Sequence, residues 1–123
     1  AQRIRTAYER TSQVIHPPID PEFFTPADVP REDFYLMVTA LAPYKRVDQA
    51  IDAFAQLDRP MRIIGSGQLA GKLRRIAPPN VTLLGWQSDE VVRDHYRRCR
   101  ALIHPGEEDF GLVPLEAMAL AAR

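Results

Sequence analysis

Two glutamates near the end of the chain, Glu108 and Glu116, are separated by seven residues. Between them, Gly111 permits unusual backbone angles, and Pro114 suits the first turn of a helix because it has no N–H group to leave unpaired. The backbone N–H groups around this turn are therefore free at a helix N-terminus, which is a ready site for phosphate. These groups belong to Phe110, Gly111, Leu112 and Val113.

A carboxylate repels phosphate, so the two glutamates need a different partner. Ionised carboxylates only accept hydrogen bonds, and sugar hydroxyls are good donors. A ligand with a phosphate between two sets of hydroxyl groups would match the helix N-terminus and the two glutamates. A nucleotide diphosphate sugar has that arrangement. A second interpretation stays open, in which Glu116 only complements the helix dipole and residues 107–109 form a solvated acidic loop.

Two cations, Lys45 and Arg46, follow the first predicted strand and precede a helix. They can neutralise a diphosphate, although such a pair is also typical of a solvated helix start. The second predicted strand leads into GSGQLA, residues 65–70, in which Gly65 and Gly67 match a G-x-G-x-x-A dinucleotide fingerprint.

The fingerprint fails its confirming test. A nicotinamide site also needs an acidic residue at the end of the next strand, to bind ribose. That strand ends instead in Gly85 and Trp86. The glycines of both strand ends still allow the backbone to approach a ligand closely.

The composition excludes several classes of protein. Sixteen basic residues balance sixteen acidic ones among 123, so bulk charge gives no argument for nucleic acid or an anionic membrane. The single cysteine excludes a disulfide framework within the chain and fits a reducing compartment. The three histidines show no metal-ligand spacing. With no long apolar run or signal peptide, the sequence predicts a cytoplasmic domain without metal or cofactor.

Apolar periodicity predicts alternating strands and helices. The strands are expected over residues 35–41, 61–64, 81–84 and 101–103, and the helices over 4–10, 46–57, 68–76, 89–98 and from 112 onward. Residues 13–15 are a candidate short strand, and Ser88 is expected to cap the helix that follows it.

This order predicts an α/β, Rossmann-like fold, with a parallel sheet and helices on both faces. Ligands bind such sheets outside the carboxyl ends of the strands, which is where the candidate residues lie. Five prolines within residues 16–30 exclude a regular helix there. We therefore expect an interdomain helix and linker over residues 1–30, anchored by Ile19, Phe23 and Phe24, and a nucleotide-sugar-binding domain over 31–123.

The motifs together resemble a known family. GEEDFGLVPLEAMA resembles the E-x(7)-E signature of retaining glycosyltransferase family 4, within the glycosyl transferases group 1, which has the GT-B fold. Its companions occur in the family's order: VIHPPID, YLMVTALAPYKRVDQAIDAF, RIIGSGQ and NVTLLGWQSDEVVRDHY. The resemblance covers nearly the whole chain.

The resemblance implies a role for each matching residue. Lys45 would clamp the donor diphosphate, Glu116 would hold the nucleotide ribose, and Glu108 would lie near the transferred sugar. The amides of residues 110–113 would contact sugar and phosphate. Gly85 and Trp86 would frame the base, with Trp86 either stacking on it or anchoring the next helix.

Two departures from the family pattern matter. Ala40 stands where many members have arginine, a charge that Arg46 would have to supply. The loop PGEEDFG is also shorter than usual. PYKR and EEDFG resemble a subgroup of bacterial mannosyltransferases that use GDP-mannose in surface polysaccharide synthesis.

The resemblance further implies that the chain is an incomplete donor-binding half. A GT-B enzyme has an N-terminal acceptor domain, through which peripheral membrane contact would occur. We therefore expect the isolated chain to lack transferase activity. Two other classes stay open: a nicotinamide-dependent oxidoreductase domain, and a non-catalytic nucleotide-binding module.

Overall fold

A parallel four-stranded sheet forms the centre of the molecule. The computed structural model describes residues 1–106, 108 and 110–121. The strand order is β3-β2-β1-β4, and every neighbouring pair is parallel. The strands are β1 (Tyr35–Val38), β2 (Met61–Ile64), β3 (Val81–Gly85) and β4 (Ala101–Leu102). The predicted α/β, Rossmann-like fold is confirmed.

The helices are α1 (Gln2–Tyr8), α2 (Val47–Leu57), α3 (Ala70–Ile76), α4 (Asp89–Arg98) and α5 (Leu112–Ala121), with a short 3₁₀ helix η1 (Pro43–Lys45) before α2. Parallel pairing requires crossover connections, and α2, α3 and α4 occupy them, whereas α1 precedes β1 and α5 follows β4. Residues 13–15 form no strand, so that local prediction is wrong. Ser88 lies at the predicted N-cap position of α4, but its side chain makes no capping hydrogen bond.

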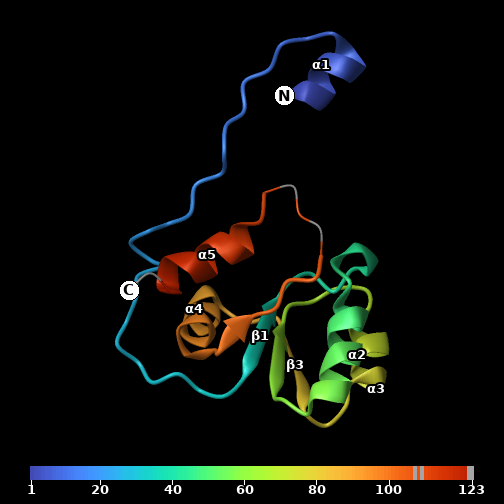
Figure 1. Ribbon diagram of the computed structural model, residues 1–123, viewed down its shortest axis with the longest axis vertical. Helices are drawn as coiled ribbons and strands as arrows, with labels where there is room; N and C mark the ends of the chain where they lie inside the picture. The colour runs from blue at the N-terminus through green and yellow to red at the C-terminus, as the bar shows by residue number, and fades with distance from the viewer. Residues whose placement is uncertain (107, 109, 122–123) are drawn as a thin grey trace.

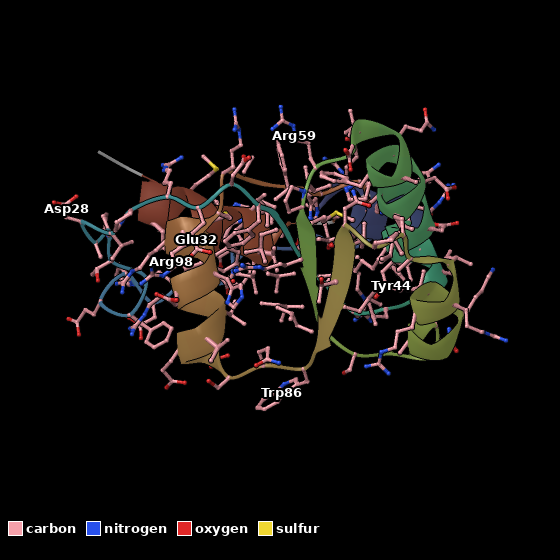
Figure 2. The ribbon with its side chains drawn as sticks, turned by 90° about the horizontal axis from the view of Figure 1, so that it is seen from below. Asp28, Glu32, Tyr44, Arg59, Trp86 and Arg98 are labelled. Atoms are coloured by element: carbon pink, nitrogen blue, oxygen red, sulfur yellow. The ribbon has the colours of Figure 1, made fainter. Side chains whose placement is uncertain are left out.

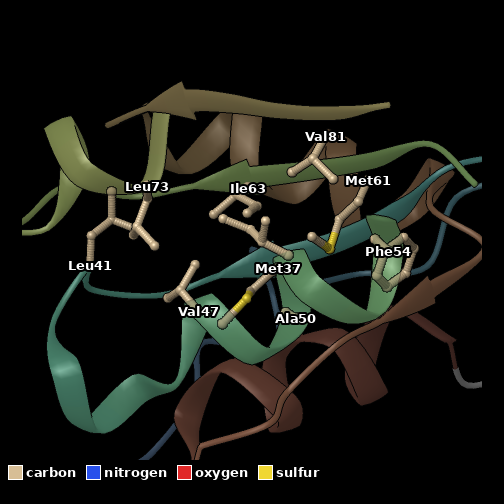
Figure 3. Packing of buried hydrophobic residues seen from close by; sticks show 10 residues of the cluster. Met37, Leu41, Val47, Ala50, Phe54, Met61, Ile63, Leu73 and Val81 are labelled. Carbon is tan, nitrogen blue, oxygen red and sulfur yellow. The ribbon is translucent and has the colours of Figure 1, made fainter. Parts of the chain in front are cut away.

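One hydrophobic core lies between the sheet and the layer of α2 and α3 (Figure 3). Val47, Ala50, Ile51 and Phe54 recur at three- and four-residue spacing along α2, so one helix face is buried. They pack against inward side chains of β1 and β2, among them Met37.

A second core covers the opposite face of the sheet, beneath α4 and α5. Leu36 of β1 and Ile64 of β2 point into it, alternating with the residues of the first core. Tyr96 and Cys99 close it from the end of α4, and Leu120 closes it from α5. Figure 1 shows the two helical layers on either side of the strands.

The linker, within residues 1–30, contacts α4 before the chain enters β1. Arg93 stacks its guanidinium 4.3 Å from the ring of Phe23, and Arg97 donates a hydrogen bond of 2.7 Å to the carbonyl of Thr25. Phe24 packs against the second core. The predicted anchors Phe23 and Phe24 are thus confirmed, and Ile19 is half-buried. α1 has no buried residue and lies far from the sheet (Figure 1).

Two glycines shape the turn that follows β2. Gly65 has φ +140°, and a Cβ there would overlap the backbone carbonyl of Thr39. Gly67 has φ +157°, and its Cβ would lie 2.6 Å from the carbonyl oxygen of Leu41. The end of β1 and the turn after β2 therefore lie against each other, backbone to backbone, where any side chain is excluded.

Candidate functional site

A pocket of about 390 Å³ opens at the carboxyl ends of β1, β2 and β3. Gly65 and Trp86 line it from the strand ends, and Val113 and Glu116 line it from α5. Asp89, at the start of α4, adds a second carboxylate. This is the edge of the sheet at which the sequence predicts ligand binding. Four of the predicted binding residues meet there.

Glu116 is held in place by a tyrosine. The Tyr96 hydroxyl donates a hydrogen bond of 3.1 Å to Oε2 of Glu116. Burial raises the pKa of the Glu116 carboxyl, and Asp89 raises it further, while the Tyr96 bond opposes the shift. Burial and Glu116 together raise the pKa of Tyr96, which therefore stays a donor. Glu116 lines the first pocket, where its carboxylate can accept hydrogen bonds from hydroxyl groups of a ligand.

The raised pKa of Glu116 predicts how its charge affects stability. The folded chain binds the Glu116 proton more tightly than the unfolded chain does, so this group's contribution falls as pH rises through its folded pKa. Glu116→Gln, which keeps an acceptor for Tyr96, should raise the free energy of unfolding at pH 7 by less than about 1 kcal/mol, because solvent screens a half-buried charge. Urea unfolding of parent and variant should show this gain shrinking toward pH 4. A gain that grows on acidification would contradict the assignment.

A second pocket of about 330 Å³ adjoins the first, since Val113 lines both. It contains Lys45, Glu108, Gly111 and Leu112. Lys45 and Glu108 form an ion pair, with side chains 15% and 28% exposed. The structure therefore brings together the two residues predicted to act on diphosphate and sugar, although they are 63 positions apart.

The amino end of α5 forms one wall of this second pocket. Gly111 has φ +83°, which turns the chain into the helix, and the amide of Leu115 donates to the Gly111 carbonyl at 3.4 Å. The earlier amides of the first turn lie where a helix leaves its donors unpaired. Phe110, also predicted to bind the donor, lines the same pocket and stacks on His16 at 5.1 Å between ring centroids.

Trp86 is a surface side chain rather than a core anchor. It is 73% exposed, and Figure 2 shows its ring pointing outward below the end of β3. The interpretation of Trp86 as an anchor against the next helix is therefore wrong. Its position at the rim of the first pocket leaves a flat aromatic face available for stacking.

Three other predicted residues have local structural roles. Arg46 takes a left-handed conformation before α2, and its Nε lies 3.9 Å from Asp48. Gly67 packs against the β1 end, and the Gly85 carbonyl accepts a hydrogen bond of 2.8 Å from the Gly65 amide. Among the described residues, none of the three lines either pocket.

Sequence reasoning missed Asp89 and Tyr96 as site residues. Asp89 reads as an ordinary first-turn acid, and Tyr96 as a core residue two turns later. The usable signal was the position of Asp89, because a helix that follows β3 must begin at the binding edge of the sheet.

Within residues 1–106, 108 and 110–121, no group of three or more His, Cys, Asp or Glu side chains is placed to hold a metal ion. No helix in the same part of the chain has the length and apolar character needed to cross a membrane.

Two curated proteins are similar to this chain in sequence. An uncharacterized glycosyltransferase of Methanocaldococcus jannaschii is 37% identical over 92 residues, covering 71% of this chain and 26% of that protein. O-antigen chain mannosyltransferase C of Escherichia coli is 31% identical over 97 residues, covering 73% of this chain and 26% of that protein. The chain thus spans about a quarter of the length of both relatives.

A solved structure supports the same fold. The crystal structure of Anabaena HepE, in complex with UDP and glucose, superposes with a TM-score of 0.69 at 20% identity, over 87% of this chain and 35% of that one. The family described as Glycosyl transferases group 1 matches residues 19–122, which include both glutamates and, apart from Pro17, the lining of both pockets. The chain belongs to the glycosyl transferases group 1 family.

Proposed function

We propose that the chain is the donor-binding part of a retaining glycosyltransferase. The parent enzyme transfers mannose from GDP-mannose to a surface-polysaccharide or glycolipid acceptor. The observation that carries this proposal is the order of groups across the two adjoining pockets. Glu116 lies in one, Lys45 and Glu108 lie in the other, and the start of α5 lies between them. Hydroxyl acceptors therefore flank a region that favours phosphate.

Each part of the donor has a matching group. The diphosphate binds at the amino end of α5 and draws Lys45 from its ion pair with Glu108. The ribose hydroxyls donate to Glu116, and the base stacks on Trp86. As the bond to the sugar breaks, charge grows on the leaving diphosphate, and Lys45 and the α5 amides stabilise it. Arg46 and the glycines Gly65, Gly67 and Gly85 support this binding edge.

The choice of mannose and guanine rests on two similarities. PYKRVD and EEDFG resemble users of GDP-mannose, and the E. coli relative is named a mannosyltransferase. HepE, by contrast, was crystallised with UDP and glucose, so the base is the part of the proposal that most needs measurement. The acceptor binds to a separate domain of the parent, which works in the cytoplasm and contacts the membrane from its inner face.

The nicotinamide alternative is not favoured. The turn after β2 does carry the glycines of a dinucleotide fingerprint, but these pack against the β1 end. The β3 strand ends in glycine and tryptophan rather than in an acidic residue. The family match supports nucleotide-sugar binding instead.

Calorimetric titration with GDP, UDP, ADP and NAD tests the proposal. GDP should bind about tenfold more tightly than UDP, because stacking contributes about 1–3 kcal/mol per base and a purine offers the larger face to Trp86. Trp86→Ala should reduce this preference. UDP binding tighter than GDP would refute guanine and mannose only, whereas tightest binding of NAD would refute the transferase assignment.

A further inference from the structure

The loop after β4 places a histidine beside the Lys45–Glu108 pair. Nε2 of His104 lies 3.7 Å from Oε1 of Glu108, the same oxygen that pairs with Lys45. Gly106 holds the loop close to Lys45, since a Cβ on Gly106 would meet the Lys45 backbone at 3.4 Å. His104, Glu108 and Lys45 thus form one cluster whose three charged or polar ends converge.

The His104 ring nitrogen lacks a hydrogen bond. Nε2 is buried, and no partner within hydrogen-bonding distance exists among the described residues. Leaving a buried donor unsatisfied is unfavourable, so the side chain gains from any acceptor that comes within reach. Glu108 is that acceptor: closing the gap from 3.7 Å to an ordinary N–H···O distance of about 2.9 Å needs a shift of about 0.8 Å.

The two partners of Glu108 would act in turn. Lys45 carries a single ammonium group, and if it turns to the diphosphate it can no longer neutralise Glu108. The freed carboxylate would then lie near the anionic phosphate and be repelled from it. We propose that His104 is a positioning residue, which holds the Glu108 carboxylate through Nε2 once Lys45 turns to the donor. A carboxylate only accepts hydrogen bonds, so Nε2 is the donor in this pair.

The first arm of the test needs no ligand. Lys45→Met frees Glu108, so NMR should then show a slowly exchanging, downfield Nε2–H proton of His104. This signal should disappear in the double variant Lys45→Met/Glu108→Leu. His16→Gln and His95→Gln serve as assignment controls, because these are the other histidines of the chain. The same His104 signal with and without Glu108 would overturn the inference, as would its absence from Lys45→Met.

The second arm rests on the proposed function and uses calorimetry with GDP and GDP-mannose. His104→Phe should weaken GDP-mannose binding about tenfold, through the loss of a charge-assisted bond. It should weaken GDP binding less, because Lys45 turns to the diphosphate in both complexes but only GDP-mannose has a sugar for the positioned Glu108 carboxylate to contact. His104→Gln, whose amide can donate, should restore most of the sugar-dependent affinity. Equal weakening of both ligands, or no change in either, would overturn the positioning role. If the parent chain binds neither nucleotide, the proposed function fails, and the NMR arm still decides the role of His104.

Discussion

Gly65→Ala is expected to lower the free energy of unfolding by about 3 to 5 kcal/mol. The new Cβ would force strain at a φ of +140° and would overlap the Thr39 carbonyl. Neither backbone can retreat easily, because Thr39 donates its amide to the Ile64 carbonyl and Gly65 donates its amide to the Gly85 carbonyl. Chemical denaturation followed by circular dichroism measures the loss.

Gly71→Ala provides the matched control for this prediction. Gly71 lies in α3, where a Cβ meets no atom within 4 Å, and alanine favours a helix over glycine by up to about 1 kcal/mol. The same substitution should therefore be neutral or stabilising there. If Gly65→Ala and Gly71→Ala change the free energy of unfolding by the same amount, Gly65 is not needed for the close contact between the ends of β1 and β2.

The largest expected effect on binding is that of Glu116→Ala. GDP binding should weaken by about 1.5–3 kcal/mol, because charge-assisted hydrogen bonds from the ribose hydroxyls are lost. Pyrophosphate has no hydroxyls, so its affinity should change little. Isothermal calorimetry with both ligands measures the difference, and circular dichroism verifies that the variant is folded.

Lys45→Ala is the complementary variant, because Lys45 addresses the phosphate charge that both ligands share. It should weaken GDP and pyrophosphate by similar factors. Tyr96→Phe adds a further control, since it removes the hydrogen bond that orients Glu116 and keeps the carboxylate. Should Glu116→Ala weaken both ligands equally, Glu116 would be a support of α5 and not a ribose ligand.

The bounds of a strand could be predicted from the sequence where a short run of buried residues lies between residues that end a strand. β2 has the predicted bounds because four residues between Pro60 and Gly65 are buried or nearly so. β1 ends at Val38, earlier than predicted, although Leu41 still donates to the carbonyl of Ser66 in the glycine turn. At residues 13–15, Ile15 is 84% exposed. A strand forms only beside a partner, and hydrophobic residues alone cannot show that one is present.

The sequence predicts which residues belong to the candidate site, but it does not predict which of their side chains contact one another. Glycine, proline and the two glutamates mark the start of α5 in the sequence itself. That Lys45 reaches Glu108, or that Tyr96 bonds to Glu116, depends on where the crossovers bring distant segments. The side chain of Arg46 is likewise directed by its left-handed backbone, with φ 52°, which periodicity does not reveal.

The attachment of the linker to α4 bears on the shape of the site. Arg93 and Arg97 of α4 donate hydrogen bonds to the carbonyls of Phe23 and Thr25, and the Asp20 side chain accepts hydrogen bonds from the amides of residues 22 and 23. This stretch is therefore attached to the domain. Residues 1–15 are all exposed and have no such hold. His16 stacks on Phe110, and Pro17 lines the Lys45 pocket. The chain that leads from α1 to the attached stretch therefore supplies part of the wall at the proposed phosphate end of the site.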